Sequence, residues 1–124
     1  MIESRPLLSV VDDDESVRES LPDLLQEFGF AVETFASAEE FLASGRIGET
    51  RCLIVDIAMP GMSGLDLQRE LVQRHQKVPI VFITGHADQS VILCLFEQGA
   101  VACLRKPFSD TALREALDVA LALP

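Results

Sequence analysis

The sequence predicts an α/β fold in which five parallel strands form one open, doubly wound sheet with helices on both faces. Apolar or alternating runs that read as strands take turns with segments whose apolar residues recur at helical spacing. This alternation is typical of a parallel sheet wrapped by helices. The 124 residues are enough for one domain with a hydrophobic core and too few for two domains of ordinary size. We therefore expect a single domain over residues 1–124.

The strands are predicted from short runs of apolar residues. Four of these runs read as buried strands, whereas the run over residues 30–35 alternates between apolar and polar side chains. In chain order, the predicted strands cover residues 7–11, 30–35, 52–55, 80–83 and 101–105.

The helices are predicted between and after these strands. Gly29 and Gly99 mark two helix ends, and Ser37 begins the second helix with Glu40 three residues further on, as in a capping box. The first helix contains Pro22, which removes a backbone hydrogen bond, so we expect that helix to persist with a bend over residues 18–22. In chain order, the helical patterns cover residues 17–28, 37–42, 63–72, 91–98 and 113–121.

Composition and charge narrow the classes of function. The hydrophobic fraction of 48% and the charged fraction of 24% are those of a compact soluble protein. No apolar run reaches the roughly 18 residues that cross a bilayer, and residues 1–6 lack the features of a signal peptide. We therefore expect a cytoplasmic protein with no membrane association. The net charge of −10 argues against direct contact with nucleic acid, because phosphate backbones are bound by clustered Lys and Arg.

Polar side chains follow four of the predicted strands at the point where each strand ends. Asp12 and Asp13 follow the first strand, Asp56 the third, Thr84 the fourth and Lys106 the last. The carboxyl ends of parallel strands meet at one edge of a sheet, and ligands bind in the crevice there. These side chains are therefore expected to converge, which is the strongest functional signal in the sequence.

The three carboxylates predict a metal site. Their oxygens are hard ligands suited to Mg²⁺ or Mn²⁺. Without a cation, Asp12, Asp13 and Asp56 would repel one another, so we expect the pKa of at least one of them to rise. The alternative is that residues 12–14 solvate a loop or cap the next helix, and for Asp14 we favour that role.

Asp56 also has the features of a nucleophile. An unpaired carboxylate at the end of an apolar strand is costly to bury, and aspartate is an established phosphoryl acceptor. The hydroxyl of Thr84 and the ammonium of Lys106 could bind phosphoryl oxygens and stabilise negative charge there. Alone, these residues read as a turn aspartate, a turn threonine and a surface lysine. Only their combination is specific.

Four motifs carry a resemblance to a known family. They are VDDDESVR at residues 11–18, DIAMPGMSG at 56–64, ITGH at 83–86, and the Gly-Ala and Lys-Pro-Phe of residues 99–108. Together they resemble the CheY-like receiver domain of bacterial two-component response regulators, with the pattern of the FixJ-type subgroup. The match covers essentially the whole chain.

The resemblance implies a flavodoxin-like fold with strand order 2-1-3-4-5. It implies that Asp56 accepts a phosphoryl group from a sensor histidine kinase. The domain would then be a signalling phosphoacceptor that catalyses its own phosphorylation and dephosphorylation, not an enzyme on an outside substrate. The resemblance further implies Mg²⁺ held by Asp13, Asp56 and the backbone carbonyl of Ala58, with Asp12 acting through water.

The resemblance also implies how the signal leaves the site. Thr84 and Lys106 would sense the phosphoryl group, and the Lys106–Pro107 bond would be cis. The face around the fourth helix and fifth strand would then change its partners, through a homodimer or an output that controls transcription.

Cys103 departs from the family pattern. Such receivers carry tyrosine or phenylalanine at this position, and the ring swings inward as the threonine engages the phosphoryl group. A thiol lacks that bulk, so the usual coupling to Thr84 is in question. We expect Cys103 to pack without a role in switching, so that the signal passes through movement of loops and helices alone. The alternative is that Phe96, on the neighbouring helix, supplies the bulk of the missing ring.

The fourth predicted helix is apolar on all sides over residues 91–96. A helix on the outside of a small domain cannot bury every side, so Ile92, Leu95 and Phe96 are expected to form an exposed partner surface. The alternative is a displaced helix that packs deeper.

Three functions are compatible with the sequence. The leading hypothesis is a phosphorylation switch, and the second is an interaction module that has kept the fold and lost switching, which Cys103 slightly favours. The third is a phosphatase-type enzyme with Asp56 as nucleophile. It is disfavoured because comparable hydrolases carry a second aspartate where this chain has Ala58. Residues 117–124 read as a helix running into a linker, which suits a stand-alone domain or the N-terminal part of a longer regulator.

Overall fold

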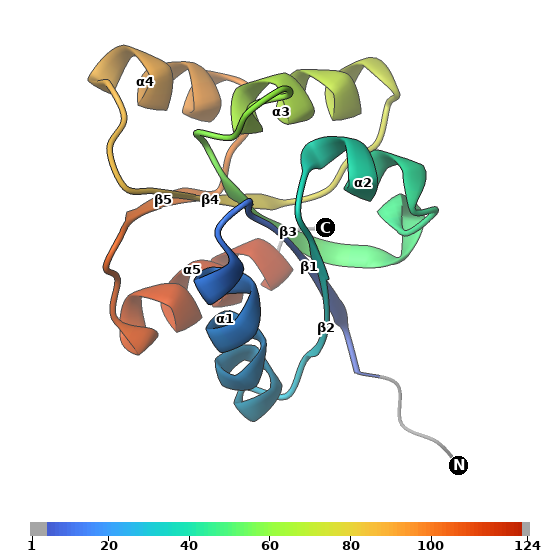
Figure 1. Cartoon of the computed structure of the whole chain (residues 1–124), viewed down its shortest axis with the longest axis vertical. Helices are drawn as coiled ribbons and strands as arrows, with labels where there is room; N and C mark the ends of the chain where they lie inside the picture. Colours follow the sequence, from blue (N-terminus) through green and yellow to red (C-terminus); the bar gives the residue numbers. More distant parts are fainter. Residues whose placement is uncertain (1–4, 123–124) are drawn as a thin grey trace.

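Five parallel strands form the centre of the computed structural model, which describes residues 5–122 (Figure 1). Their order, β2-β1-β3-β4-β5, confirms the expected topology. The strands are β1 (Leu7–Val11), β2 (Ala31–Phe35), β3 (Thr50–Asp56), β4 (Ile80–Thr84) and β5 (Ala102–Arg105). The helices are α1 (Glu15–Glu27), α2 (Ala38–Ala43), α3 (Gly64–Gln73), α4 (Gln89–Glu97) and α5 (Asp110–Ala122), with a short 3-10 helix, η1 (Ile47–Glu49), before β3.

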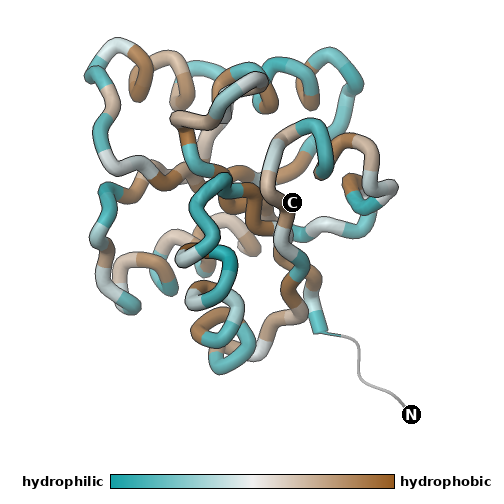
Figure 2. Tube along the Cα trace, in the orientation of Figure 1, coloured by the Kyte–Doolittle hydropathy of each residue, from teal (hydrophilic) through white to brown (hydrophobic). Residues whose placement is uncertain are grey.

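The helices cover both faces of the sheet, as the alternating pattern predicts. Helices α1 and α5 lie on one face, and α2, α3 and α4 lie on the other (Figure 1). Each layer encloses its own apolar core, and the strands between them are the most hydrophobic part of the trace (Figure 2). Every residue of β4 is buried, which explains why its sequence is almost continuously apolar.

The register of the sheet aligns the ends of its central strands. Val11 of β1 lies opposite Val55 of β3, and Asp56 lies opposite Ile83 of β4. Thr84 in turn lies opposite Arg105 of β5. The residues that end these strands therefore lie along one edge of the sheet.

Two helices begin at caps that the sequence predicts. Ser37 is the N-cap of α2, and its hydroxyl accepts a hydrogen bond from the backbone N–H of Glu40 (3.1 Å), as expected. Asp14 is the N-cap of α1, and its side chain accepts a hydrogen bond from the backbone N–H of Ser16, which confirms a capping role for this third aspartate. Ser63 caps α3 in a reciprocal capping box with Asp66. Pro22 lies inside α1, which continues on both sides of it; the expected bend there stays a prediction.

The surface of α4 differs from the prediction. Leu95 is fully buried in the core, so its assignment to an exposed surface was wrong, and Ile92 is half-buried. Phe96 is 44% exposed, as predicted. The other exposed apolar residue of this helix is Leu93, at 53%, which was not predicted to be part of the surface. The reason is helical periodicity: Leu95 and Val91, four residues apart, face the core, so Leu93 and Phe96 face outward.

Three smaller features complete the description of the fold. The three cysteines are free, and Cys52 is buried while Cys94 and Cys103 are half-buried. Within the described residues, no helix is both long and apolar enough to cross a membrane. Helix α5 is described as far as Ala122, so the last two residues of the expected linker, 123 and 124, lie outside the described part of the chain.

Candidate functional site

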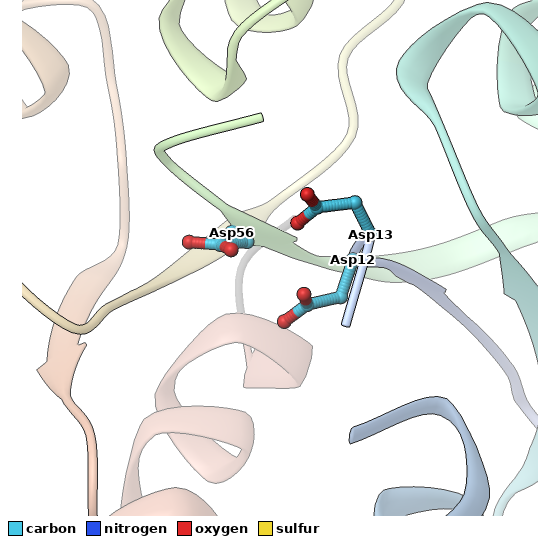
Figure 3. Close-up of side chains that lie close together, drawn as sticks. All are labelled: Asp12, Asp13 and Asp56. Atoms are coloured by element: carbon cyan, nitrogen blue, oxygen red, sulfur yellow. The ribbon is translucent and has the colours of Figure 1, made fainter. Parts of the chain in front are cut away.

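Three carboxylates meet at the carboxyl edge of the sheet (Figure 3). Asp12 and Asp13 directly follow β1, and Asp56 is the last residue of β3. One oxygen from each carboxylate lies within 4.8 Å of the others. The sequence predicts this convergence correctly, because the two strands pair in parallel and end at the same level.

Asp12 is fully buried, and each of its backbone and side-chain polar atoms forms a hydrogen bond. Its backbone N–H donates to the carbonyl of Phe35 (3.1 Å), and its own carbonyl accepts from Arg18 (2.8 Å). One carboxylate oxygen accepts from the backbone N–H of Asp14 (2.9 Å), and the other accepts from the ammonium of Lys106 (3.0 Å). Sequence reasoning did not give Arg18 this role, although the residue closes the first motif.

The pKa of Asp56 is raised from 3.8 to about 6. Burial is the main cause, because the residue is only 7% exposed, and the neighbouring charge of Asp12 adds to it. Lys106, with its ammonium nitrogen 3.6 Å from an Asp56 oxygen, acts in the opposite direction but does not cancel the rise. The predicted rise in a carboxylate pKa is thus found at Asp56.

Lys106 lies between the two buried carboxylates. Burial alone would lower its pKa, but its hydrogen bond to Asp12 and the charges of Asp12 and Asp56 outweigh burial, so the pKa lies above its usual value. The lysine is therefore a fixed positive charge at neutral pH. Its peptide bond to Pro107 is cis, as the resemblance implies.

Thr84 ends β4 beside this cluster. Its backbone carbonyl accepts a hydrogen bond from the backbone N–H of Lys106 (2.7 Å), which fixes the two residues to each other. Its hydroxyl is buried and has no hydrogen-bond partner among the described residues. A buried hydroxyl without a partner is uncommon and costs free energy, so this oxygen has an unused capacity to form a hydrogen bond.

The loop after Asp56 depends on Gly64, the first residue of α3. A Cβ on Gly64 would lie 2.8 Å from the carbonyl oxygen of Asp56 and 2.9 Å from the Cα of Ile57. The Gly64 N–H also donates to the Ile57 carbonyl (2.9 Å), which closes the loop. This tight turn carries Ala58, whose N–H lies 3.4 Å from an Asp56 oxygen.

Cys103 lies on β5 opposite Phe82, half-buried against the core on the α3 and α4 side. Burial raises the pKa of its thiol, so it is neutral at physiological pH. Phe96 is 44% exposed, so it does not serve as a buried ring in place of the missing aromatic residue.

The donor set at the acidic edge fits a hard divalent cation. Asp13 is exposed while Asp12 and Asp56 are buried, so the cluster opens to solvent on one side. Magnesium prefers such a site, with one or two carboxylates and space for water. Burial and the charge of Asp12 raise the pKa of Asp56, and a cation bound beside these carboxylates would favour their ionised form.

A parallel sheet of this order, with an acidic cluster and a lysine at its carboxyl edge, defines the class of receiver domains. The family model described as "Response regulator receiver domain" matches residues 8–118. The chain therefore belongs to the receiver domains of two-component response regulators, which are signalling domains and not metabolic enzymes.

Similar proteins agree with this assignment. Nodulation protein W of Bradyrhizobium diazoefficiens is 42% identical over 92% of this chain and 50% of its own length. The transcriptional regulatory protein FixJ of Azorhizobium caulinodans is 40% identical over 98% of the chain and 57% of its own length. The chain thus spans about half the length of the curated relatives it matches.

Solved structures show the same fold. The response regulator StyR superposes with a TM-score of 0.88 and 45% identity, covering 95% of this chain and 60% of that one. The structure named FixJ-N superposes with a TM-score of 0.85 and 38% identity, covering 100% of this chain and 98% of the other.

Proposed function

We propose that this domain is a switch in which Asp56 accepts a phosphoryl group from a sensor histidine kinase, with Mg²⁺ as cofactor. The observation that carries the proposal is the convergence of Asp12, Asp13, Asp56 and Lys106 at one edge of the sheet. Membership of the receiver family supports it independently.

In the proposed step, a carboxylate oxygen of Asp56 forms a bond to phosphorus while the bond from phosphorus to the donor's imidazole nitrogen breaks. The nitrogen keeps the electron pair of that bond and takes a proton. The pKa of about 6 leaves Asp56 mostly ionised at neutral pH and therefore nucleophilic. Lys106 stands 3.6 Å from an Asp56 oxygen, where its charge can bind a phosphoryl oxygen.

The proposed metal ligands are Asp13, Asp56 and the backbone carbonyl of Ala58, with Asp12 acting through water. A Mg²⁺ ion bound there would neutralise the carboxylates and the charge of the incoming phosphoryl group. Arg18 holds the backbone carbonyl of Asp12 and so keeps the turn that carries both aspartates in place.

Thr84 is proposed to read the phosphorylated state. Its buried hydroxyl, without a partner among the described residues, can donate to a phosphoryl oxygen on Asp56. Because the Thr84 carbonyl is bonded to the Lys106 N–H, a shift of either residue is passed to the other. Because the side chain of Cys103 is small, we propose that the change at the site reaches the surface through movement of the loops and helices.

The proposed output is transcription, controlled by another part of a longer regulator or by a partner. Relatives named transcriptional regulatory proteins support this, since the chain matches about half of their length. The switched face is proposed to centre on α4, where Leu93 and Phe96 are exposed and could pair with a second copy.

Intact-mass measurement tests the proposed chemistry. Wild-type protein incubated with acetyl phosphate and Mg²⁺ should gain one phosphoryl group, and the Asp56→Asn variant and a metal-free sample should gain none. If the folded wild type gains no adduct from acetyl phosphate or from a panel of phosphorylated kinases, the phosphorylation-independent interaction module becomes the better account.

A further inference from the structure

The loop between β3 and α3 is held against helix α2. Met59 of this loop is 8% exposed and belongs to the core cluster that contains Phe41 of α2. The backbone N–H of Met62 donates to Oε2 of Glu39, the second residue of α2 (3.3 Å). The two residues are 23 positions apart in the chain. The loop that carries Ala58 is therefore anchored to a different element of the fold.

The loop also leaves space for the Glu39 carboxylate. A Cβ on Gly61 would lie 2.9 Å from Glu39 Oε2, and the φ of Gly61 is +75°, in the left-handed region that favours glycine. A side chain at position 61 would push on the same oxygen that accepts the hydrogen bond from Met62. Two separate features of the loop, a backbone donor and a missing side chain, thus fit this carboxylate.

Helix α2 is fixed at the end that carries Glu39. The hydroxyl of Ser37 caps the helix by accepting from the Glu40 N–H (3.1 Å). Phe41 is fully buried, and its ring meets that of Phe35 edge-on with 5.4 Å between the centroids. Glu39 itself is exposed, so the packing of the core does not depend on its side chain.

We propose that Glu39 is a positioning residue for the metal site. By accepting the Met62 N–H, it restrains the loop that carries Ala58, whose backbone carbonyl is a proposed Mg²⁺ ligand. A restrained loop loses less conformational freedom when the ion binds, which raises the affinity. The inference rests on the proposed function, because it assumes that Mg²⁺ binds at Asp13 and Asp56.

The affinity for Mg²⁺ is measured on the full 124-residue chain by NMR titration, followed at the amides of Asp13 and Asp56. Glu39→Ala should raise the dissociation constant about three- to fivefold, the effect of losing one hydrogen bond to a charged group near the surface. Glu39→Gln loses the same charge but keeps an acceptor oxygen, so it should retain most of the affinity. The difference between alanine and glutamine separates the hydrogen bond from the charge.

A metal-free measurement tests the contact itself. The Met62 amide should exchange with solvent faster in Glu39→Ala than in the wild type, because it has lost its acceptor. Glu40→Ala is the matched control, since it removes a carboxylate from the same first turn of α2 and leaves the Met62 contact intact. Its Met62 exchange should equal that of the wild type.

Gly61→Ala tests the same contact from the side of the loop. Its methyl group would displace the end of the flexible Glu39 side chain, so the hydrogen bond from Met62 would be lost with the carboxylate still present. The substitution should therefore weaken Mg²⁺ binding less in the Glu39→Ala background than in the wild type. Equal losses in the two backgrounds would overturn the proposed role of Glu39.

Failure of this inference is distinct from failure of the metal site. If Glu39→Ala binds Mg²⁺ as tightly as Glu39→Gln, or leaves Met62 exchange unchanged, the role of Glu39 is overturned while the metal site stands. A wild-type protein that shows no Mg²⁺-dependent shift at Asp13 or Asp56 would overturn the metal site, and the role of Glu39 with it.

Discussion

Asp56 ends a strand of apolar residues, and this position sets both its reactivity and its cost to stability. Its pKa of about 6 in the folded protein exceeds the ordinary value of 3.8, so folding favours the protonated form. Between these two values the folded state binds more protons than the unfolded state, and the free energy of unfolding therefore falls as pH rises through that window. Above about pH 6, Asp56 is ionised in the folded protein, and the free energy of unfolding is reduced by the full cost of burying its charge.

The Asp56→Asn substitution removes this cost. In metal-free buffer at pH 8, the variant should be more stable than the wild type by on the order of 2 kcal/mol. The difference should shrink as pH falls through 6 toward 4, because the wild-type carboxyl then becomes neutral as well. Urea unfolding at several pH values measures it, and a difference that does not change with pH would refute the raised pKa.

Thr84 offers a second test, because its buried hydroxyl has no partner among the described residues. Thr84→Val keeps the shape and removes the unpaired group, so the unphosphorylated protein should gain up to about 1 kcal/mol in stability. The same variant should gain less than the wild type from beryllofluoride, which mimics the phosphoryl group. Thermal melts with and without the mimic measure both effects.

A clear loss of stability in Thr84→Val without the mimic would mean that the hydroxyl already has a partner. Thr84→Ser is the matched control, since it keeps the hydroxyl and should keep most of the response to beryllofluoride.

Among the elements, the turn from β3 into α3 is the one that the acidic site depends on most directly. Gly64→Ala would place a methyl group 2.8 Å from the Asp56 carbonyl oxygen, against backbone that cannot move freely. We expect it to destabilise the protein by about 2 kcal/mol or more and to weaken Mg²⁺ binding through displacement of Asp56. Thermal melts with increasing Mg²⁺ measure both.

Gly48→Ala is the matched control for this substitution. A Cβ on Gly48 would meet no other atom within 4 Å, and the backbone there is not left-handed, so stability should change by less than about 0.5 kcal/mol. Equal effects of the two alanines would show that the β3–α3 turn is not the constraint proposed here.

Helix α4 shows where sequence reasoning reached its limit. The strands and the site residues that end them were predictable, because each apolar run stops at a polar residue and parallel pairing brings those stops together. Every position over residues 91–96 of α4 is apolar, so the pattern does not say which side of this helix faces the core. The structure decides it, with Leu95 inward and Leu93 and Phe96 outward.

Two further features could not be predicted from the sequence, because they depend on how the elements pack. They are the hydrogen bond from Arg18 to the Asp12 carbonyl and the hydrogen bond from the Met62 N–H to Glu39. No local pattern in the sequence encodes either contact. For the hydrogen bond to the Asp12 carbonyl, the only signal in the sequence was that Arg18 is the last residue of the first motif.

For the whole molecule, the exposed apolar residues of α4 predict assembly on activation. Beryllofluoride with Mg²⁺ should shift the protein toward a dimer, and the Leu93→Ser and Phe96→Ser double variant should remain monomeric. Sedimentation velocity measures the shift. Val119→Ser is the control, because Val119 is 56% exposed on α5, and α5 covers the opposite face of the sheet from α4 (Figure 1).

A double variant that dimerises as the wild type does would move the interface elsewhere. A wild-type protein that stays monomeric under all conditions would contradict dimerisation and would mean that the α4 face binds a different partner.

The central claim is that Asp56 carries the phosphoryl group, and locating that group tests it most directly. Protein treated with acetyl phosphate and Mg²⁺ is reduced with borohydride, which converts an aspartyl phosphate to homoserine, and the peptides are then sequenced by mass spectrometry. The account predicts homoserine at position 56 and unmodified aspartate at positions 12 and 13. Homoserine at another position, or none in a sample whose intact mass shows the adduct, would contradict it.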